Sequence, residues 1–512
     1  MKGENHSRFA FFPALIASPV IQAAIADEAS RRGISTEAAR QQVQRFLQEI
    51  AARYSPATMR FAARCFAWLW PRLYDAIEVY RFEQVTKQEA TARIVYIPAH
   101  RSHLDYLLLS SLLYARAQPV PLVAAGINLN LPLVGALLRR CGAFFMRRSF
   151  KGEALYSAVF SEYLHLLQQQ GTVLEYFIEG GRSRSGFTLT PKTGLLGMSL
   201  ASFLRDHSRP LVFMPVYIGY EKLFESESYL RELSGEAKKK ESLWGLLQTL
   251  RRIRRIYGRV QVNFGEPLDL ADFLECHYPG WRNAAPETRT ASARELSLPL
   301  ARALATRINA AAVIGPINLI ALVLLGAPEH ALDEAALYRR LEHCQVLSRT
   351  LPATSAGIEC SLAASQIVAY AERLGQVERR GASVVIPAGQ AVALAYFRNN
   401  ILHRFILPAL IARLLCEVRT MPRQRLVQSV CQHYDGLREA LFLCGDADEV
   451  KASAEAMINT LFSRRLLREG GDRRLETPES AAEEFADLQG LGAMLPQEVF
   501  PAEAGKDKLP AA

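Results

Sequence analysis

The segment HRSHLD at residues 100–105 gathers side chains that can move a proton, because two histidines, a serine and an aspartate lie within it. A carboxylate that accepts a hydrogen bond from the Nδ1–H of an imidazole fixes its tautomer and leaves Nε2 as a general base. Such a pair can activate a hydroxyl for attack on a carbonyl. Residues five apart do not share a face of an ideal helix. His100 and Asp105 can therefore pair only if His100 precedes the helix and folds back over its first turn.

A helix start explains part of the same segment. Ser102 followed by Asp105 has the spacing of an acidic capping box, and an apolar helical pattern comes next. This alternative accounts for Ser102 and Asp105 but leaves His100 unexplained. His103, which lies about one turn further on, is interpreted as structural.

Short apolar segments alternate with helical patterns between residues 91 and 270. The strands that we predict are TARIVYIPA, PVPLVAA, CGAFFM, TVLEYFIE, PLVFMPVYIG and RVQVNFG. This alternation favours an α/β fold with a mixed, mostly parallel sheet flanked by helices. Such sheets bind ligands at the carboxyl ends of their strands. HRSHLD, MRRS, EGGRSRSG and the PVYIGYEK turn all lie at or beside strand ends, so we expect them to share one site.

Basic residues in these strand-end segments suit a phosphorylated ligand, because guanidinium and ammonium groups bind a phosphate dianion. The set is Arg147, Arg148, Arg182, Arg184 and Lys192, and Gly180 and Gly181 would let the backbone approach a ligand closely. The net charge is +10, but no nucleic-acid-binding motif accompanies it, so we do not expect a nucleic-acid partner. Eight scattered cysteines without a CxxC pair argue against a disulfide framework and a structural metal.

Taken in order, these blocks resemble those of one enzyme family. HRSHLD is similar to the HxxxxD motif of the glycerolipid acyltransferases, and PAHRSHLDYLLLS resembles the bacterial glycerol-3-phosphate acyltransferase group in particular. GAFFMRRSFKG at 142–152, YFIEGGRSRSG at 176–186 and MPVYIGYEK at 214–222 resemble the second, third and fourth blocks of that family. The likeness extends from RRGISTEAARQQ to YFRNNILHRF and covers most of the chain.

The resemblance implies roles for residues of this sequence. His100 would be the general base and Asp105 its orienting partner. The resemblance implies that Phe145, Arg148, Glu179, Gly180, Ser183 and Pro215 bind substrate. Arg182 is added to these substrate-binding residues because its guanidinium group suits a phosphate. The segment YFRNNILH in the C-terminal region is interpreted as a polar packing network.

The implied reaction transfers a fatty acyl group from acyl-CoA or acyl–acyl carrier protein to the sn-1 hydroxyl of glycerol 3-phosphate. The product would be lysophosphatidate, in the first step of phospholipid biosynthesis. We expect direct attack of the hydroxyl on the thioester, because no serine or cysteine stands in a nucleophile elbow, and no metal or tightly bound cofactor. Three alternatives stay open: dihydroxyacetone phosphate as acceptor, lysophosphatidate as acceptor, and a non-catalytic lipid-binding protein with the same fold.

Four regions are predicted along the chain. Residues 1–90 form N-terminal helices that could contact a membrane, and residues 91–290 form the α/β acyltransferase domain. Residues 291–470 form a C-terminal helical region, and residues 471–512 form a flexible tail. The basic run RRIRRIYGR at 251–259 is interpreted as a solvated helix face.

Two segments bear on membrane attachment. Residues 59–82 interleave aromatic residues with arginines, as interfacial helices do, although a core-packed helix fits equally well. The apolar segment 309–327 is interrupted by Gly315 and Pro316, which favours a buried or surface helix pair over a membrane span. No cleaved signal peptide is predicted. We therefore expect a peripheral or monotopic protein at the cytoplasmic face of the bacterial inner membrane, with the phospholipid surface as a partner.

Overall fold

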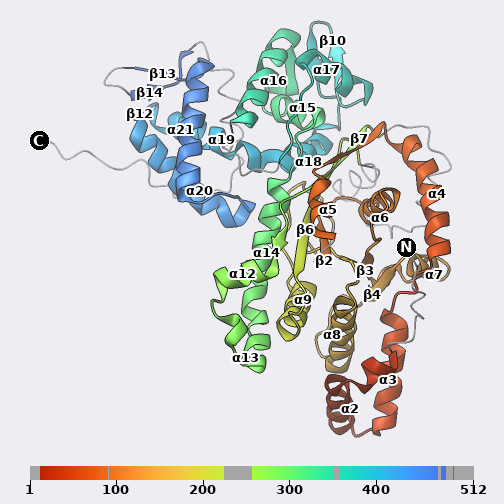
Figure 1. Ribbon diagram of the computed structural model, residues 1–512. Coiled ribbons are helices and arrows are strands. Elements are labelled where there is room, and N and C mark those ends of the chain that lie inside the picture. The colour runs from red at the N-terminus through yellow and green to blue at the C-terminus, as the bar shows by residue number, and fades with distance from the viewer. Residues whose placement is uncertain are drawn as a thin grey trace, which may run out of the picture.

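The computed structural model describes residues 12–89, 92–223, 257–350, 357–470, 474–479 and residue 488. Within these residues the largest sheet has eight strands in the order β1-β7-β6-β2-β5-β3-β4, with β8 paired to β6 (Figure 1). The neighbours β6, β2, β5, β3 and β4 are parallel, whereas β7 and β8 are antiparallel to β6. The predicted mixed, mostly parallel sheet is confirmed.

The strands of this sheet are short and largely apolar. They span Ala76–Tyr80 (β1), Arg93–Pro98 (β2), Leu122–Gly126 (β3), Ala143–Met146 (β4), Leu174–Glu175 (β5), Leu211–Tyr220 (β6), Arg259–Phe264 (β7) and Leu268–Asp269 (β8). Every residue of β2 and of β6 is buried, as expected where helices cover both faces of a parallel sheet. All six predicted strands are present, but β5 is much shorter than expected because the chain leaves the sheet after Glu175.

One prediction for the N-terminal part was wrong. Residues 59–82 are not helical throughout, because α4 (Pro56–Leu73) ends and β1 then pairs with β7 in parallel. The segment AIEVY of β1 carries the β-branched Ile77 and Val79, both packed against the core. The sheet therefore begins at residue 76, ahead of the boundary expected at 91.

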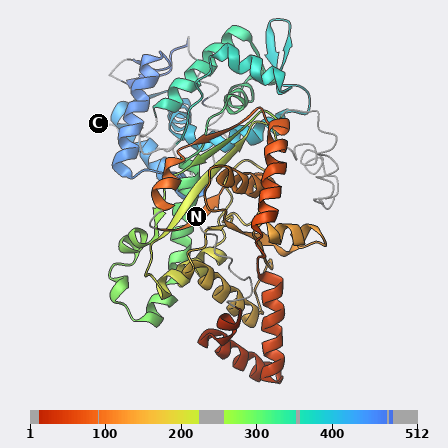
Figure 2. The same cartoon turned by 45° about the vertical axis from the view of Figure 1, so that its right-hand side comes forward.

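Different helices cover the two faces of the sheet. On one face α6 (Asp105–Ala115) packs with α4 and α5 (Glu83–Glu89). On the other lie α8 (Ala154–Gln169), α9 (Gly194–Arg205) and α14 (Ala293–Ala310), with the N-terminal helices outside α8 (Figure 2). Those N-terminal helices are α1 (Phe12–Ala17), α2 (Pro19–Arg32) and α3 (Thr36–Ile50). Ser35 caps α3, and Gly33 ends α2 in the left-handed conformation.

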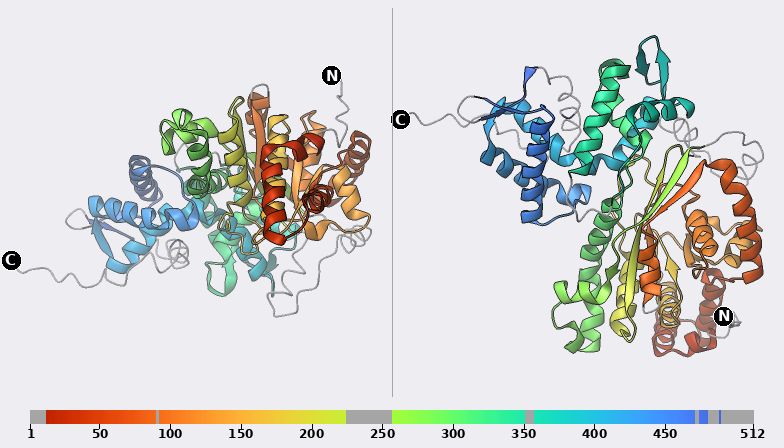
Figure 3. Two further views of the ribbon diagram at one scale, coloured as in Figure 1. Left: turned by 90° about the horizontal axis from the view of Figure 1, so that it is seen from below. Right: turned by 45° about the horizontal axis from the view of Figure 1, so that its top comes forward.

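The C-terminal region is mostly helical, as predicted, but it also contains two small antiparallel sheets. Figure 3 shows this region on the side of the molecule away from the N-terminal helices. Its helices are α15 (Pro316–Leu324), α16 (Glu334–Arg349), α17 (Ala364–Arg373), α18 (Ala391–Ile401), α19 (Ile406–Val418), α20 (Arg423–Leu441) and α21 (Ala447–Ser463). Its strands are Ala331–Asp333 (β9), Glu378–Arg380 (β10), Ser383–Val385 (β11), Thr420–Pro422 (β12), Arg468–Glu469 (β13) and Arg474–Glu476 (β14). Within the α/β part of the chain, α7 (Val134–Arg140) connects β3 to β4 at one edge of the sheet. After the sheet, α12 (Leu270–His277) packs against β6 and β8, and α13 (Pro286–Ala291) packs against α9 and α14.

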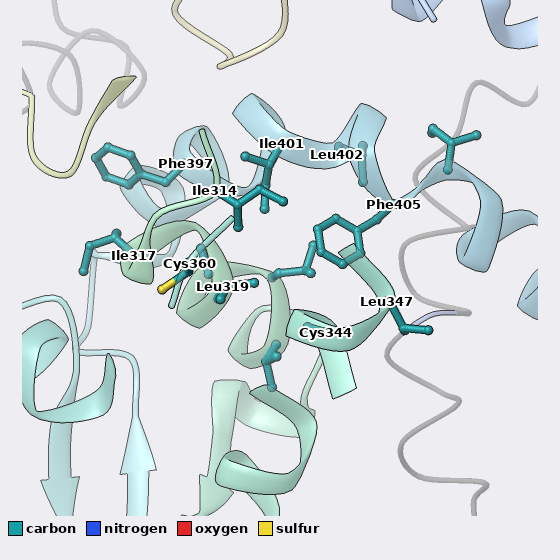
Figure 4. Close-up of a cluster of buried hydrophobic side chains, with 14 of the residues drawn as sticks. Ile314, Ile317, Leu319, Cys344, Leu347, Cys360, Phe397, Ile401, Leu402 and Phe405 are labelled. Atoms are coloured by element: carbon teal, nitrogen blue, oxygen red, sulfur yellow. The ribbon is translucent and has the colours of Figure 1, made fainter. Parts of the chain in front are cut away.

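The apolar segment 309–327 is part of the core. Pro316 starts α15, and every residue of this helix is buried. Figure 4 shows Ile317 and Leu319 of α15 among side chains from α16 and α18. Across the described parts of the chain, no helix combines the length and the apolar character that crossing a membrane needs. The basic run at 251–259 and the tail at 471–512 lie mostly outside the described residues.

Candidate active site

His100 and Asp105 form a hydrogen-bonded pair at the carboxyl end of β2. The imidazole Nδ1 lies 3.1 Å from Asp105 Oδ2. The ring of His100 is 17% exposed, whereas the Asp105 side chain is fully buried. Among the described residues, Nε2 of His100 has no hydrogen-bond partner, so it is the nitrogen available to a ligand. The predicted fold-back of His100 over the start of the helix is confirmed.

Asp105 is held by the backbone in front of α6. Its Oδ2 also accepts hydrogen bonds from the amides of Arg101 and Ser102, at 2.7 and 2.8 Å. Its Oδ1 accepts a 2.7 Å hydrogen bond from the hydroxyl of Tyr220. The helix begins at Asp105 itself, and the Ser102 hydroxyl accepts from the Leu104 amide. Ser102 is thus not the N-cap of α6, and the carboxylate forms only one half of the expected capping box.

The loop that follows β5 fixes His100 from the other side. Glu179 accepts a hydrogen bond from the His100 amide at 2.9 Å and one from the Leu189 amide at 3.0 Å. The Ser183 amide donates to the His100 carbonyl at 2.9 Å. The Ser183 hydroxyl donates to the Phe187 carbonyl and accepts from the Gly186 amide, which shapes the turn. Glu179 and Ser183 are buried, and both hold the backbone that carries the imidazole.

Three residues of the site were missed by the sequence analysis. Phe177 stacks on the His100 ring with centroids 4.0 Å apart. Arg101 is buried, and its guanidinium donates to the Phe187 carbonyl at 3.1 Å. Tyr220 reaches Asp105 from the end of β6, at a separation of 115 residues. Nothing local in the sequence marks these three contacts, because each joins segments that meet only in the folded chain.

The two adjacent arginines of the second block have different surroundings. Arg147 Nε and Nη2 donate to the two carboxylate oxygens of Glu49 in α3, at 2.8 and 2.9 Å, and Arg147 also pairs with Glu153. Arg148 is exposed and has no hydrogen-bond or ion-pair partner among the described residues. Arg148 is therefore the arginine of this block whose charge is open to a ligand.

Comparisons with known proteins identify the family of this chain. A family model described as "Glycerol-3-phosphate acyltransferase C-terminal region" matches residues 229–499, more than half of the chain, and one described as "Acyltransferase" matches residues 76–219. The chain belongs to the glycerol-3-phosphate acyltransferase family. The predicted family resemblance is thus confirmed.

Relatives within this family match nearly the whole chain. The glycerol-3-phosphate acyltransferase of Ectopseudomonas mendocina is 40% identical over 489 residues, which are 94% of this chain and 59% of that protein. The enzyme of the same name from Pseudomonas putida is 41% identical over 495 residues, again 94% of this chain and 59% of the relative. The chain thus spans about three fifths of the length of these curated relatives. Among solved structures, the 1-acyl-sn-glycerophosphate acyltransferase of Thermotoga maritima matches 48% of this chain and 78% of its own, with 19% identity and a TM-score of 0.27.

Two residues that the family resemblance singles out are buried in strands. Phe145 in β4 is fully buried, with the Arg139 guanidinium 4.5 Å above its ring. Pro215 in β6 pairs in register with Ile97 of β2, and its carbonyl accepts from the Gly265 amide at 2.8 Å. Their side chains shape the sheet beneath the site, and their assignment to substrate binding stays a prediction.

The third block of the family surrounds a tight backbone turn. Gly180 has a φ of +64°, and a Cβ at this position would come within 2.8 Å of the Lys192 side chain. The left-handed backbone conformation therefore favours glycine there, and a larger residue would also displace the Lys192 side chain. Arg182 is partly exposed, and Lys192 is exposed. The turn thus places two cations near the backbone that binds His100.

A buried carboxyl lies close to Asp105 of the His100–Asp105 pair. Glu175 in β5 is fully buried, and neither of its oxygens has a hydrogen-bond partner among the described residues. Burial, followed by the charge of Asp105, raises the pKa of Glu175 well above its ordinary value. A carboxyl whose pKa is raised in this way favours its neutral form, in which it adds no second negative charge beside Asp105.

Proposed function

We propose that this chain transfers a fatty acyl group from a thioester donor, acyl-CoA or acyl–acyl carrier protein, to the sn-1 hydroxyl of glycerol 3-phosphate. The observation that carries the proposal is the His100–Asp105 pair, with Nδ1 on the carboxylate and Nε2 open. The names of the relatives, each a glycerol-3-phosphate acyltransferase, favour this acceptor. No resident cofactor enters the proposed reaction.

The proposed chemistry is a direct displacement. Nε2 of His100 takes the proton of the acceptor hydroxyl as its oxygen attacks the thioester carbonyl. The carbon–sulfur bond then breaks, and the imidazolium returns the proton to the leaving thiolate. Asp105 stabilises the imidazolium in between, and the Tyr220 hydroxyl and two amides keep the carboxylate aligned with Nδ1. The products are 1-acylglycerol 3-phosphate and a free thiol.

The acceptor phosphate is proposed to bind among the cations at the strand ends. Arg148 is open to a ligand, and Arg182 and Lys192 extend from the neighbouring loop. A phosphate dianion held there would position the sn-1 hydroxyl toward His100. A positioned base supplies roughly 10²–10⁴ in rate, so orientation by these cations has to contribute much of the remainder.

An acceptor assay tests the proposed function. The purified chain is incubated with labelled palmitoyl-CoA and, in separate reactions, glycerol 3-phosphate, dihydroxyacetone phosphate or lysophosphatidate. We expect product with glycerol 3-phosphate, and loss of turnover in His100→Ala with an unchanged melting temperature. Turnover with another acceptor alone would replace the substrate assignment. A His100→Ala variant of near-normal activity would remove His100 from the mechanism.

We also propose that the protein attaches peripherally to the cytoplasmic face of the bacterial inner membrane. Large apolar side chains are exposed on α4, Phe61 at 64% and Trp68 at 60%, and on the adjoining segment around α7, Leu133 at 86%. Arg60 and Arg64 flank these positions in α4. An apolar surface with arginines beside it suits anionic lipid headgroups.

Vesicle flotation tests this attachment. We expect the protein to float with vesicles of phosphatidylglycerol, and the double variant Phe61→Ser/Trp68→Ser to remain at the bottom of the gradient. Val392→Ser, which alters another exposed apolar side chain (51% exposed), serves as the control. Flotation of the double variant equal to that of the control would contradict the assignment of this face.

A further inference from the structure

Helix α18 of the C-terminal region lies directly against the loop of the third block. The Asn399 side-chain amide donates a 2.8 Å hydrogen bond to the Ser185 carbonyl, which bridges 214 residues of sequence. Gly186 has a φ of +87°, and a Cβ there would overlap the Tyr396 carbonyl oxygen and come within 3.1 Å of Asn399 Cβ. The two segments therefore touch at backbone distance, which only glycine permits.

The same loop carries the bonds that hold the catalytic histidine. The Ser183 amide donates to the His100 carbonyl, and the Phe187 carbonyl accepts from the buried Arg101 guanidinium. A short run of hydrogen bonds thus connects His100, through residues 183–187, with Asn399. The YFRNN segment, expected to be a polar packing network, borders the site.

The core fixes one face of α18 and leaves Arg398 on another. Phe397 and Ile401 are buried, and Figure 4 shows them among side chains of α15 and α16. Arg398 follows Phe397 and is half-buried. Because α18 is anchored by its apolar face, its polar residues have a fixed position beside the loop.

Arg398 lacks the carboxylate partner that a half-buried arginine normally has. Its Nε and Nη2 both donate to Asn399 Oδ1 at 3.1 Å, and Asn399 in turn binds the Ser185 carbonyl. Among the described residues no acid pairs with it, and its Nη1 has no recorded acceptor. Burial alone lowers the pKa of the Arg398 guanidinium, with no neighbouring charge offsetting that cost. A cation desolvated in this way is stabilised when an anion binds it.

We infer that Arg398 binds a phosphate group of a substrate, so that the C-terminal region supplies part of the binding site at the third block. The inference rests on the proposed function and deepens it. Two substrates carry such a group: the acceptor has a phosphate monoester, and a coenzyme A donor has a 3′-phosphate and a pyrophosphate. Guanidinium binds all of these through paired N–H donors.

Steady-state kinetics of Arg398→Gln test the inference and identify the source of the phosphate. Removing a hydrogen bond to a charged group costs roughly tenfold or more in affinity, so we expect one KM to rise by about that factor with little change in kcat. A higher KM for glycerol 3-phosphate identifies the acceptor. A higher KM for palmitoyl-CoA, with no difference between variant and wild type when palmitoyl-pantetheine is the donor, identifies the coenzyme A phosphates.

Arg413→Gln is the matched control, because Arg413 lies on α19 in the same region and pairs with Glu417. It should change neither KM. If Arg398→Gln leaves both KM values at the wild-type level, or lowers kcat alone, Arg398 is structural and the inference is wrong.

A binding measurement separates this inference from the proposed function. Inorganic phosphate, glycerol 3-phosphate and coenzyme A are added separately to the wild-type protein and to Arg398→Gln, and the shift in melting temperature is recorded. A shift in the wild type that shrinks in the variant supports Arg398 as a phosphate ligand, even if no acceptor is acylated. Equal shifts in both proteins with all three ligands overturn the inference and leave the acyltransferase proposal untouched.

Discussion

The loops that follow β4 and β5 both carry arginines toward the candidate site, but opposite flanking regions hold them. Residues 147–153 are tied to the N-terminal helix α3 by the ion pair between Arg147 and Glu49. Residues 180–188 are packed against α18 of the C-terminal region, where Gly186 meets the Tyr396 backbone. Figure 1 shows these two regions on opposite sides of the sheet.

The kind of contact also differs between the two loops. The Arg147 guanidinium lies over the rings of Phe46 and Tyr156, 5.0 and 4.4 Å from their centroids, and contacts of this kind tolerate small shifts. The contact at Gly186 is steric and leaves no space for adjustment. Contacts outside the sheet therefore help to position both loops. The contact that holds the loop next to His100 tolerates less displacement than the one that holds the loop after β4.

The largest effect is expected from a substitution at Gly186, where the loop contacts the Tyr396 backbone. Gly186→Ala adds a methyl group that overlaps the Tyr396 carbonyl and strains a left-handed backbone. Displacing the loop by about 1 Å costs roughly a hundredfold in rate, so we expect such a loss of kcat/KM. Turnover is measured beside the circular dichroism melting curve and limited proteolysis between the α/β and C-terminal regions.

Gly194→Ala, at the first residue of α9, controls for the loss of a glycine near this loop. A Cβ there meets nothing within 4 Å, and the backbone does not need the left-handed region. This variant should keep its activity within about threefold, as substitutions away from packed contacts do. Comparable activity of the Gly186→Ala and Gly194→Ala proteins would show that the contact with α18 does not position the loop.

A smaller effect is expected at the loop after β4, which the ion pair between Arg147 and Glu49 holds. Substitution of its two adjacent arginines should have different effects, one on substrate binding and the other on stability. Arg148→Gln removes the open cation, so we expect about a tenfold higher KM for glycerol 3-phosphate and an unchanged melting temperature. Arg147→Gln removes a partly exposed bidentate pair and should lower the free energy of unfolding by about 1 kcal/mol. That destabilisation should shrink in high salt.

Chemical denaturation and initial-rate kinetics on both variants check this division. If Arg147→Gln raised the KM for glycerol 3-phosphate more than Arg148→Gln, the ion pair with Glu49 would have to open on substrate binding. The distinction between a structural and a ligand-binding arginine would then fail.

Local sequence patterns predicted most of the sheet and the pair of His100 and Asp105. Strand periodicity, helix caps and a motif of six residues all depend on residues that are neighbours in the sequence. The different fates of Arg147 and Arg148 could not be predicted, since the distinguishing partner, Glu49, lies on another helix. The contact between Asn399 and Ser185 spans 214 residues and arises only when the C-terminal region docks. For the same reason β1 was missed, because its pairing with β7 joins segments about 180 residues apart.

A substitution at Glu175 tests the part of the sheet that supports the loop next to His100. Glu175 lies in β5, which is placed between β2 and β3 and leads into the loop of the third block. Its folded-state pKa is raised well above the value of 4.5 that the unfolded chain shows, chiefly by burial. The folded protein therefore keeps a proton that the unfolded chain releases, and stability falls as pH rises above about 4.5, by up to roughly 1.4 kcal/mol per pH unit while the folded state stays protonated. Glu175→Gln, which cannot ionise, should lack this loss.

We expect the Glu175→Gln protein to melt at a higher temperature than the wild type by a margin that grows between pH 5 and pH 8. Melting curves across this range measure the difference. Glu162→Gln is the contrasting variant, because Glu162 is also buried but is paired with Arg205, and its loss should destabilise the protein. A margin for Glu175→Gln that is constant with pH would mean that this carboxyl is already ionised beside Asp105. The site would then carry two negative charges, and the cations of both loops would be needed to balance them even before a phosphate binds.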